Sequence, residues 1–326
     1  MNFSWHQQSW DSLLRLVERL PHALLIHGVS GIGKLAFAER FAQFLLCEAR
    51  TSAGEPCGRC EGCRWFVAGS HPDIRRVEPE TFARRAPDEE DAPSQRPAKP
   101  SSEIKIEQVR ELADFLALGS HRGRLRVALV HPAEGMNLHA ANALLKSLEE
   151  PPPGAVFILV SHRPSRLLPT VRSRCVALPM QTPPSEPALA WLGAQGLPDA
   201  ARWLAYAGGA PLRALEDGRG PRGEAIERML AALASGRAGE LTGLVDSRED
   251  LAIVAEVLQK FALDKAFASA GASPRYGTID SGTGASTGTR EWLSFARRLG
   301  ADRALTTHPL NPKLFAAEML AAMPNS

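Results

Sequence analysis

The chain has 326 residues, of which 44% are hydrophobic and 23% are charged, a composition typical of globular proteins with a buried core. Its 38 Lys and Arg residues nearly balance 36 Asp and Glu residues, and the resulting net charge of +2 excludes nucleic-acid or membrane binding through bulk charge. The amino terminus lacks a basic region followed by an apolar run, and no stretch reaches the ~20 apolar residues of a membrane span. We therefore expect a cytoplasmic protein of about two domains.

Short apolar runs in the first half of the chain predict buried parallel strands, and helical patterns separate them. The runs cover residues 22–27, 125–130, 155–160 and 175–179, and the helical patterns cover 35–46, 106–118 and a segment from Leu138. In that last helix, steps of three and four residues place Leu138, Ala141, Leu145 and Leu148 on one face. Strands that alternate with helices predict a doubly wound α/β sheet.

A glycine-rich turn separates the first strand from the helix that follows it. It reads Gly28-Val-Ser-Gly-Ile-Gly-Lys34, a sequence that aims backbone N–H groups at phosphates, and its candidate nucleotide-binding residues are Gly28, Gly31, Gly33 and Lys34. The next residue is Leu35, where the motif has a hydroxyl that binds magnesium. Two alternatives stay open, namely nucleotide binding without magnesium and a retained turn without a ligand.

Four of the five cysteines lie within 17 residues, as Cys47, Cys57, Cys60 and Cys63. Four soft ligands at this spacing, in a polar and turn-forming segment, predict a structural zinc site. A dithiol redox pair is the rival interpretation, although it needs fewer cysteines than are present. His71 is a possible substitute ligand, and an ordinary turn residue is the preferred interpretation of it.

In an ATPase with this phosphate loop, the strand at 125–130 would end in an acidic residue that helps to hold the magnesium ion. The sequence there is His131-Pro132, and Glu134 is displaced past the proline. With Leu35, this predicts that the chain alone does not carry out magnesium-dependent ATP hydrolysis.

Later segments differ in composition. Residues 79–102 are rich in proline and mixed charges and predict a mobile insertion, because they have little apolar surface to bury. Residues 181–187 predict a linker, and the sequence beyond it predicts helices, with a flexible loop at 271–288.

Two further motifs, Asn142-Ala-Leu-Leu-Lys-Ser-Leu-Glu-Glu150 and Ser173-Arg-Cys175, follow the phosphate loop and the cysteines in a recognisable order. With these motifs the chain resembles the AAA+ clamp-loader family, densely over 24–175 and elsewhere only in architecture. The resemblance implies an α/β AAA+ P-loop parallel sheet over 1–179, with an inserted zinc module at about 47–63 and the insertion at 79–102. A small helical lid domain at 180–218 and an all-helical collar domain at 219–326 would follow.

The resemblance also implies roles for single residues. Arg174, between Ser173 and Cys175, matches the arginine finger that reaches the nucleotide site of a neighbouring subunit. Arg213 matches a lid arginine that senses nucleotide, and is a candidate vestigial sensor. Glu149 and Glu150 are interpreted as the end of a helix before prolines.

The function that the resemblance implies is that of a non-hydrolysing stator in a hetero-pentameric clamp loader. Its partners would be subunits of gamma/tau and delta type, and the complex would place the sliding clamp on primed DNA as part of a DNA polymerase holoenzyme. Zinc is the expected cofactor, ATP occupancy stays open, and no membrane partner is expected. The alternatives are an ATP-hydrolysing subunit of gamma/tau type, in which Glu134 or another acid replaces the missing residues, and a zinc-containing DNA-binding module.

Overall fold

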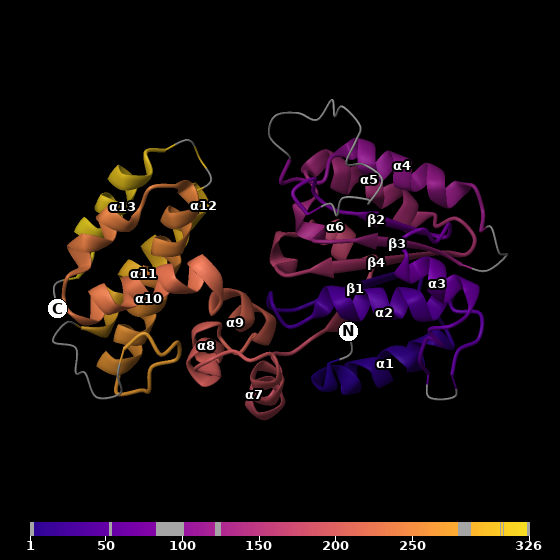
Figure 1. Cartoon of the computed structure of the whole chain (residues 1–326). Helices are drawn as coiled ribbons and strands as arrows, with labels where there is room; N and C mark the ends of the chain where they lie inside the picture. The colour runs from indigo at the N-terminus through magenta and orange to yellow at the C-terminus, as the bar shows by residue number, and fades with distance from the viewer. Residues whose placement is uncertain are drawn as a thin grey trace, which may run out of the picture. The chain divides into compact units, whose positions relative to one another are not determined.

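A computed structural model describes residues 3–51, 54–82, 101–120, 125–279, 288–306, 308 and 310–324. The chain divides into two compact units, Met1–Thr182 and Pro183–Ser326, which are considered one at a time (Figure 1). Most of the insertion predicted at 79–102 lies outside the described residues, as do residues 280–287 of the predicted loop at 271–288. None of the helices in the described part of the chain has the length and apolar character needed to cross a bilayer.

Parallel strands of the first unit form one sheet in the order β2-β3-β4-β1-β5. The strands are β1 (Ala23–His27), β2 (Ile74–Val77), β3 (Arg126–Val130), β4 (Ala155–Ser161) and β5 (Val176–Pro179). The structure confirms the four predicted strands, within one residue at each end, and adds β2. The pattern missed β2 because Arg75 and Arg76, at its centre, are exposed, whereas only its ends are buried. An edge strand with polar central residues has no continuous apolar run.

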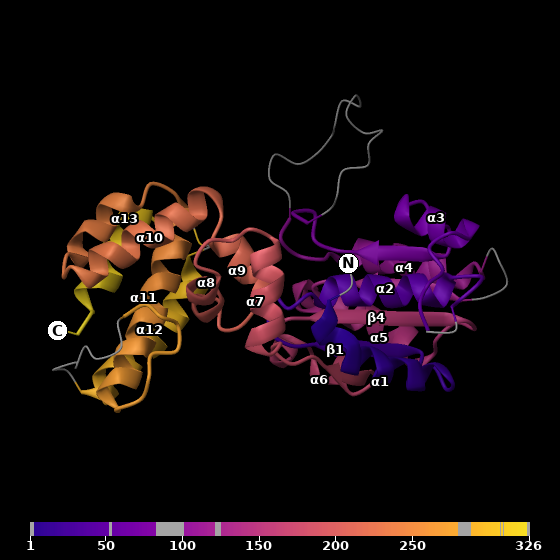
Figure 2. The ribbon, with the colours of Figure 1, turned by 60° about the horizontal axis from the view of Figure 1, so that its bottom comes forward.

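Helices cover both faces of this sheet (Figures 1 and 2). They are η1 (Ser4–His6), α1 (Gln7–Val17), α2 (Lys34–Leu46), α3 (Glu61–Val67), α4 (Ile106–Ala117), η3 (Ala133–Gly135), α5 (Leu138–Glu149), η4 (Pro164–Arg166) and α6 (Pro169–Arg172). Helices α4, α5 and α6 share one core with the strands. On the opposite side, α1 packs on α2 through Trp10, whose ring makes edge contacts with Phe37, Phe41 and Phe44. The arrangement confirms the predicted α/β class.

Helix α5 shows where the sequence pattern needs correction. Its buried residues are Ala140, Ala141, Leu144 and Leu148, whereas Leu138 is 60% exposed. The expected face was therefore wrong for Leu138. This leucine is the first residue of the helix, directly after Asn137, whose side chain accepts a hydrogen bond from the Ala140 amide and fixes where the first turn starts.

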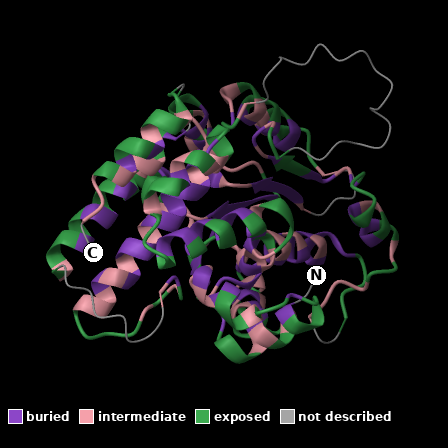
Figure 3. Cartoon of the chain, turned by 60° about the vertical axis from the view of Figure 1, so that its left-hand side comes forward, coloured by how far each residue is buried: buried purple, intermediate pink, exposed green. Residues whose placement is uncertain are grey.

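The described residues of the second unit are helical and contain no strand. Its elements are α7 (Ser185–Ala194), α8 (Ala200–Tyr206), α9 (Pro211–Asp217), α10 (Gly220–Ala234), η5 (Ala238–Leu244), α11 (Arg248–Ser269), α12 (Thr289–Leu305) and α13 (Pro312–Ala321). One cluster of buried side chains runs through these helices, from Ala188 to Met319. Buried residues are coloured purple in Figure 3. Helix α7 begins at Ser185, so the predicted linker is shorter than 181–187. The predicted boundary between lid and collar at 218/219 stays a prediction.

Candidate functional site

The phosphate loop connects β1 to α2 and requires glycine at two positions for reasons of space. Gly28 and Gly33 have φ angles of 153° and 92°. A Cβ atom on Gly28 would lie 2.3 Å from the carbonyl oxygen of Met180, and one on Gly33 would lie 2.6 Å from the ring of Phe3. Only glycine relieves both the backbone conformation and the close approach at these positions.

The amino-terminal segment packs directly on this loop. Trp5 donates a hydrogen bond from Nε1 to the Ile32 carbonyl (3.1 Å), and His6 Nε2 lies 2.8 Å from the same oxygen. Because a carbonyl oxygen only accepts, His6 carries its proton on Nε2. Burial lowers the pKa of His6 to about 4, so the ring is neutral at physiological pH. The sequence analysis did not predict this contact, for which the local signal is the group of aromatic residues Phe3, Trp5 and His6.

Lys34, the lysine of the loop, is directed back into its own turn. Its side chain is 2% exposed, and Nζ donates a hydrogen bond to the Val29 carbonyl at 2.5 Å. Burial lowers the pKa of this ammonium group to about 8, and the Glu134 carboxylate opposes that shift. The loop therefore provides an acceptor for one of the three donors of its own lysine.

Two histidines and one carboxylate lie at the carboxyl ends of β3 and β4. His131 occupies the position after β3 where the ATPase pattern has an acid, and its Nε2 is 3.2 Å from Nε2 of His162. Glu134 accepts two hydrogen bonds on Oε1, from the backbone amides of His162 (2.9 Å) and Arg163 (3.0 Å). One oxygen of Glu134 is therefore already used in holding the backbone after β4.

The cysteine cluster converges as its spacing predicts. One sulfur from each of Cys47, Cys57, Cys60 and Cys63 lies within 4.8 Å of the others. The Sγ atoms of Cys47 and Cys60 are 3.9 Å apart, close to the ~3.8 Å expected between thiolates on a tetrahedral zinc with ~2.3 Å bonds. The structure thus brings the four predicted ligands together in a geometry compatible with zinc.

Backbone groups within the cluster favour the charged thiolate. The amides of Cys57, Cys60 and Cys63 each donate to a cluster sulfur at 3.3 Å. Such bonds lower the pKa of Cys57 to about 6, whereas burial raises the pKa of Cys63 to about 12. His71 is not one of the side chains that converge in this set, and its Nδ1 accepts a hydrogen bond from the Asp73 amide (3.0 Å).

The Ser-Arg-Cys motif follows α6, and its arginine is partly exposed. Ser173 Oγ donates to the Thr170 carbonyl (3.1 Å), and Cys175 Sγ donates to the Val171 carbonyl (3.3 Å). Arg174 pairs with Glu149 at 2.5 Å, and its side chain is 33% exposed. Sequence reasoning missed this partner, because Glu149 lies at the end of α5, outside the local motif.

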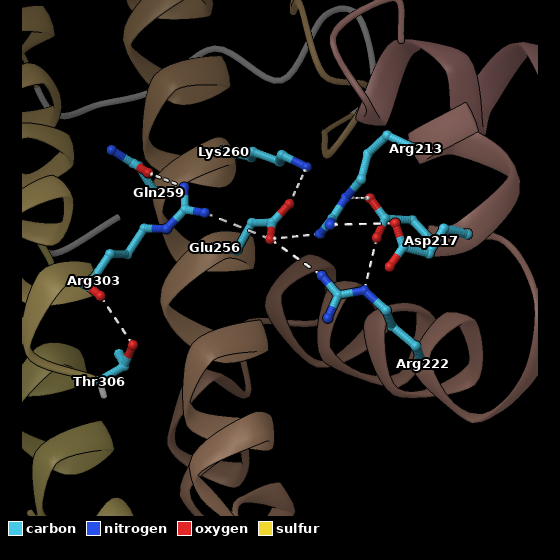
Figure 4. A network of polar contacts seen from close by, with 9 residues as sticks. Arg213, Asp217, Arg222, Glu256, Gln259, Lys260, Arg303 and Thr306 are labelled. Atoms are coloured by element: carbon cyan, nitrogen blue, oxygen red, sulfur yellow. Dashed lines mark hydrogen bonds and ion pairs between the residues drawn. The ribbon is translucent and has the colours of Figure 1, made fainter. Parts of the chain in front are cut away.

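Arg213 belongs to a network of charges within the second unit (Figure 4). Its guanidinium contacts Asp217 (2.9 Å) and Glu256 (3.1 Å), and Arg222 contacts the same two carboxylates (2.7 and 3.2 Å). Lys260 contacts Glu256 at 2.6 Å. Burial opposes ionisation of Glu256, but Lys260 and Arg213 outweigh it and lower its pKa to about 2.

A glycine-rich phosphate loop between a strand and a helix of a parallel sheet defines an α/β protein of the P-loop class. A family model described as DNA polymerase III, delta subunit, matches residues 7–184, and the chain belongs to that family.

Curated relatives give the same assignment. DNA polymerase III subunit delta′ of Pseudomonas aeruginosa is 42% identical over 217 residues, which is 65% of this chain and 60% of the relative. The Escherichia coli K12 protein of the same name is 32% identical over 237 residues, or 71% of this chain and 65% of the relative. The chain thus spans less than two thirds of their length. A solved Thermotoga maritima structure, a gamma subunit-related protein, has a TM-score of 0.45 at 20% identity, over 96% of this chain and 97% of that chain.

The motif order predicts one member of the clamp-loader family in particular. The cysteine cluster, the 142–150 segment, Ser173-Arg-Cys175 and the helical second half together resemble the delta-prime subunit of bacterial DNA polymerase III. The family match and the relatives of that name confirm this prediction.

Proposed function

We propose that this chain is a stator subunit of the DNA polymerase III clamp loader, which helps to place the sliding clamp on primed DNA without hydrolysing ATP itself. In this proposal it assembles with gamma/tau and delta subunits in a hetero-pentamer in the cytoplasm, and contacts no membrane. The names of the curated relatives support a place in the DNA polymerase III holoenzyme. The observation that carries the non-hydrolysing role is the replacement of both magnesium-holding positions, by Leu35 and by His131-Pro132.

Glu134 is a poor substitute for the missing acid, which argues against the alternative of an ATP-hydrolysing subunit. Its Oε1 holds the backbone amides of His162 and Arg163. If Oε1 turned to a metal instead, both amides would lose this acceptor, and the partly buried His162 amide would be left unpaired at a cost of about 1–3 kcal/mol, whereas the Arg163 amide is exposed to water.

Arg174 is the residue that we propose to act on a neighbouring ATP. Its ion pair with Glu149 is partly exposed, with side-chain exposures of 33% and 51%. Such a pair is worth only about 0–1 kcal/mol, so the guanidinium can exchange Glu149 for a phosphate at little cost. Arginine fingers supplied in trans raise phosphoryl-transfer rates by about 10³–10⁵.

The test is ATP hydrolysis by a loader reconstituted with its gamma/tau and delta subunits, clamp and primed DNA. Arg174→Ala should lower the rate at the adjoining site and leave assembly intact, because the side chain lies at the surface. Arg166→Ala is the matched control, since Arg166 is an exposed arginine in the same surface segment. The isolated chain should be inactive. Hydrolysis by the isolated chain, or equal rates for the Arg174 and Arg166 variants, would contradict the proposal.

We also propose that the cysteine cluster holds one structural zinc. Four thiolate donors fill a tetrahedral ion and leave no open position for catalysis. Metal analysis of protein purified under reducing conditions should find one zinc per chain, and Cys60→Ser should lose it. Chelation should loosen the region around α3 and leave the second unit unchanged in hydrogen exchange. Less than one zinc per chain would contradict the assignment.

A further inference from the structure

A buried carboxylate on α11 lies outside every site described above. Asp264 belongs to this helix, and none of its surface is exposed to solvent. A charged group taken out of water is unfavourable unless it is paired or hydrogen-bonded. Asp264 has no ion-pair partner among the residues that the structure describes. The carboxylate therefore depends on hydrogen bonds.

Four donors from one short segment converge on this carboxylate. The backbone amides of Arg275 and Tyr276 donate to its Oδ1, at 2.7 and 2.8 Å. The amide and the hydroxyl of Thr278 donate to its Oδ2, at 2.8 and 2.7 Å. Backbone N–H groups that converge in this way form a concave site for an anion. Residues 275–278, which we call the clasp, are thus closed on an anion that their own chain supplies.

The clasp also lies against the carboxyl end of α8. A Cβ atom on Gly208, just after that helix, would lie 3.6 Å from the ring of Tyr276. A Cβ atom on Gly277 would lie 3.9 Å from the side chain of Ala205 in α8. Both separations are ordinary van der Waals contacts, so the clasp touches α8 while it is hydrogen-bonded to α11.

Lys260 of α11 makes a second connection at the same junction. Its Nζ is 3.5 Å from the centre of the Tyr206 ring on α8 and 6.0 Å from the centre of the Tyr276 ring in the clasp. The same ammonium group pairs with Glu256 in the network of Figure 4. Because α8 belongs to the predicted lid and α11 to the predicted collar, the clasp crosses the boundary that the sequence predicts between them.

We propose that the clasp couples α8 to α11, so that the two helices open together, and that Asp264 keeps it closed. Opening the clasp would remove the four donors of a buried carboxylate and the acceptor of three backbone amides at once. The closed state is therefore favoured by both partners. This inference concerns the second unit alone and is independent of the proposed clamp-loader role.

Trypsin cleavage of the full chain after Arg275 measures how often the clasp is open. Arg275 is exposed, but the bond after it lies between two amides that Asp264 holds, and a protease cuts such a segment only when it opens. Asp264→Ala should speed this cleavage at least about tenfold, because one hydrogen bond to a charged group is worth at least about that factor. Cleavage after Arg237, an exposed residue just before η5, should keep its rate.

Formate makes the test specific to the carboxylate. Asp264→Ala removes a group of the size of formate, so a high concentration of formate should slow cleavage after Arg275 again, whereas the same concentration of chloride should not. Thr278→Val keeps the three amide donors and should give a smaller increase. Glu249→Ala is the matched control, since Glu249 is an exposed acid on the same helix, and it should be cleaved like the native chain.

Hydrogen exchange tests the connection to α8. The α8 amides of Asp264→Ala should exchange faster than those of the native chain, whereas the α13 amides should not change. Unchanged cleavage after Arg275, equal acceleration after Arg275 and Arg237, no effect of formate, or native exchange in α8 would each overturn the proposal. Should Asp264→Ala fail to fold, Thr278→Val decides the question, because it must then accelerate cleavage after Arg275 and not after Arg237.

Discussion

Lys34 and Arg213 are the two cations that the sequence predicts to be near a nucleotide, and their surroundings in the two units differ. Lys34 donates a hydrogen bond to the Val29 carbonyl, and burial lowers its pKa to about 8. Arg213 contacts three carboxylates, those of Glu216, Asp217 and Glu256, and their charges raise its pKa although burial opposes the shift. The fold therefore destabilises the charge on Lys34 and stabilises the charge on Arg213.

The comparison shows that two cations with similar predicted roles can have charges of opposite effect on the free energy of folding. A buried ammonium group whose burial is only partly compensated is available to a phosphate, because a new anion would improve its surroundings. An arginine that already has its carboxylates gains less from an anion and is needed by its own helices. Arg213 thus contributes structure whether or not it senses a nucleotide, and its sensor role stays a prediction.

The largest effect should come from removing the acceptor at the centre of the network in Figure 4. Glu256→Ala leaves Arg213, Arg222 and Lys260 without their shared carboxylate. Breaking a buried ion pair costs about 3–5 kcal/mol, so hydrogen exchange of the α11 amides should speed up accordingly. Glu240→Ala, at an exposed pair with Arg237, should change stability by less than about 0.5 kcal/mol. Similar effects from both variants would mean that the network adds no stability.

Acid should weaken the same network. The pKa of Glu256 is about 2 in the fold against an ordinary 4.5, so its contribution is complete above pH 4.5 and disappears as the pH falls to about 2. That shift corresponds to about 3 kcal/mol. Denaturant unfolding of the native chain and of Glu256→Gln across this range measures it, because the variant lacks the titrating group. Parallel pH curves for the two proteins would contradict the expectation.

Lys34 should also make stability rise with pH, but in an alkaline range and because its charge is unfavourable in the fold. Its folded pKa of about 8 lies below the ordinary 10.5, so the unfolded chain holds the proton longer and stability rises between pH 8 and 10.5. Over this range the free energy of unfolding of the native chain should rise by up to about 3 kcal/mol relative to that of Lys34→Met. Below pH 8 the variant should be the more stable protein. Lys105→Met, at an exposed lysine, is the control. Urea unfolding at pH 7 and pH 10 makes the comparison, and a Lys34→Met protein that is less stable at both would contradict it.

Glu149 should have the smallest effect, because its pair with Arg174 is exposed. Glu149→Gln should change ATP hydrolysis by the reconstituted loader less than about fivefold, the equivalent of about 1 kcal/mol. Glu150→Gln, at the adjacent exposed acid, is the matched control. A much larger loss in Glu149→Gln alone would mean that Glu149 orients Arg174 for its role, rather than merely neutralising it.

Local sequence patterns were sufficient to predict structural features that residues close together in the sequence form. The apolar runs predicted four strands, and the cysteine spacing predicted four sulfurs that the structure places within 4.8 Å. Features between distant segments were not predictable in this way. Glu149 meets Arg174 across 25 residues of chain, and Arg213 meets Glu256 across 43. No periodicity encodes such pairs, because the packing of whole helices decides which charged side chains face each other.

The crowding at Gly28 and Gly33 affects how the history of this loop can be interpreted. A methyl group at either position would collide with Met180 or Phe3, so selection for a folded chain is enough to preserve these glycines. A chain that had lost its nucleotide would still retain these two glycines, because larger residues do not fit at either position. The persistence of a phosphate-loop sequence in a lineage is thus no record that a phosphate was bound there.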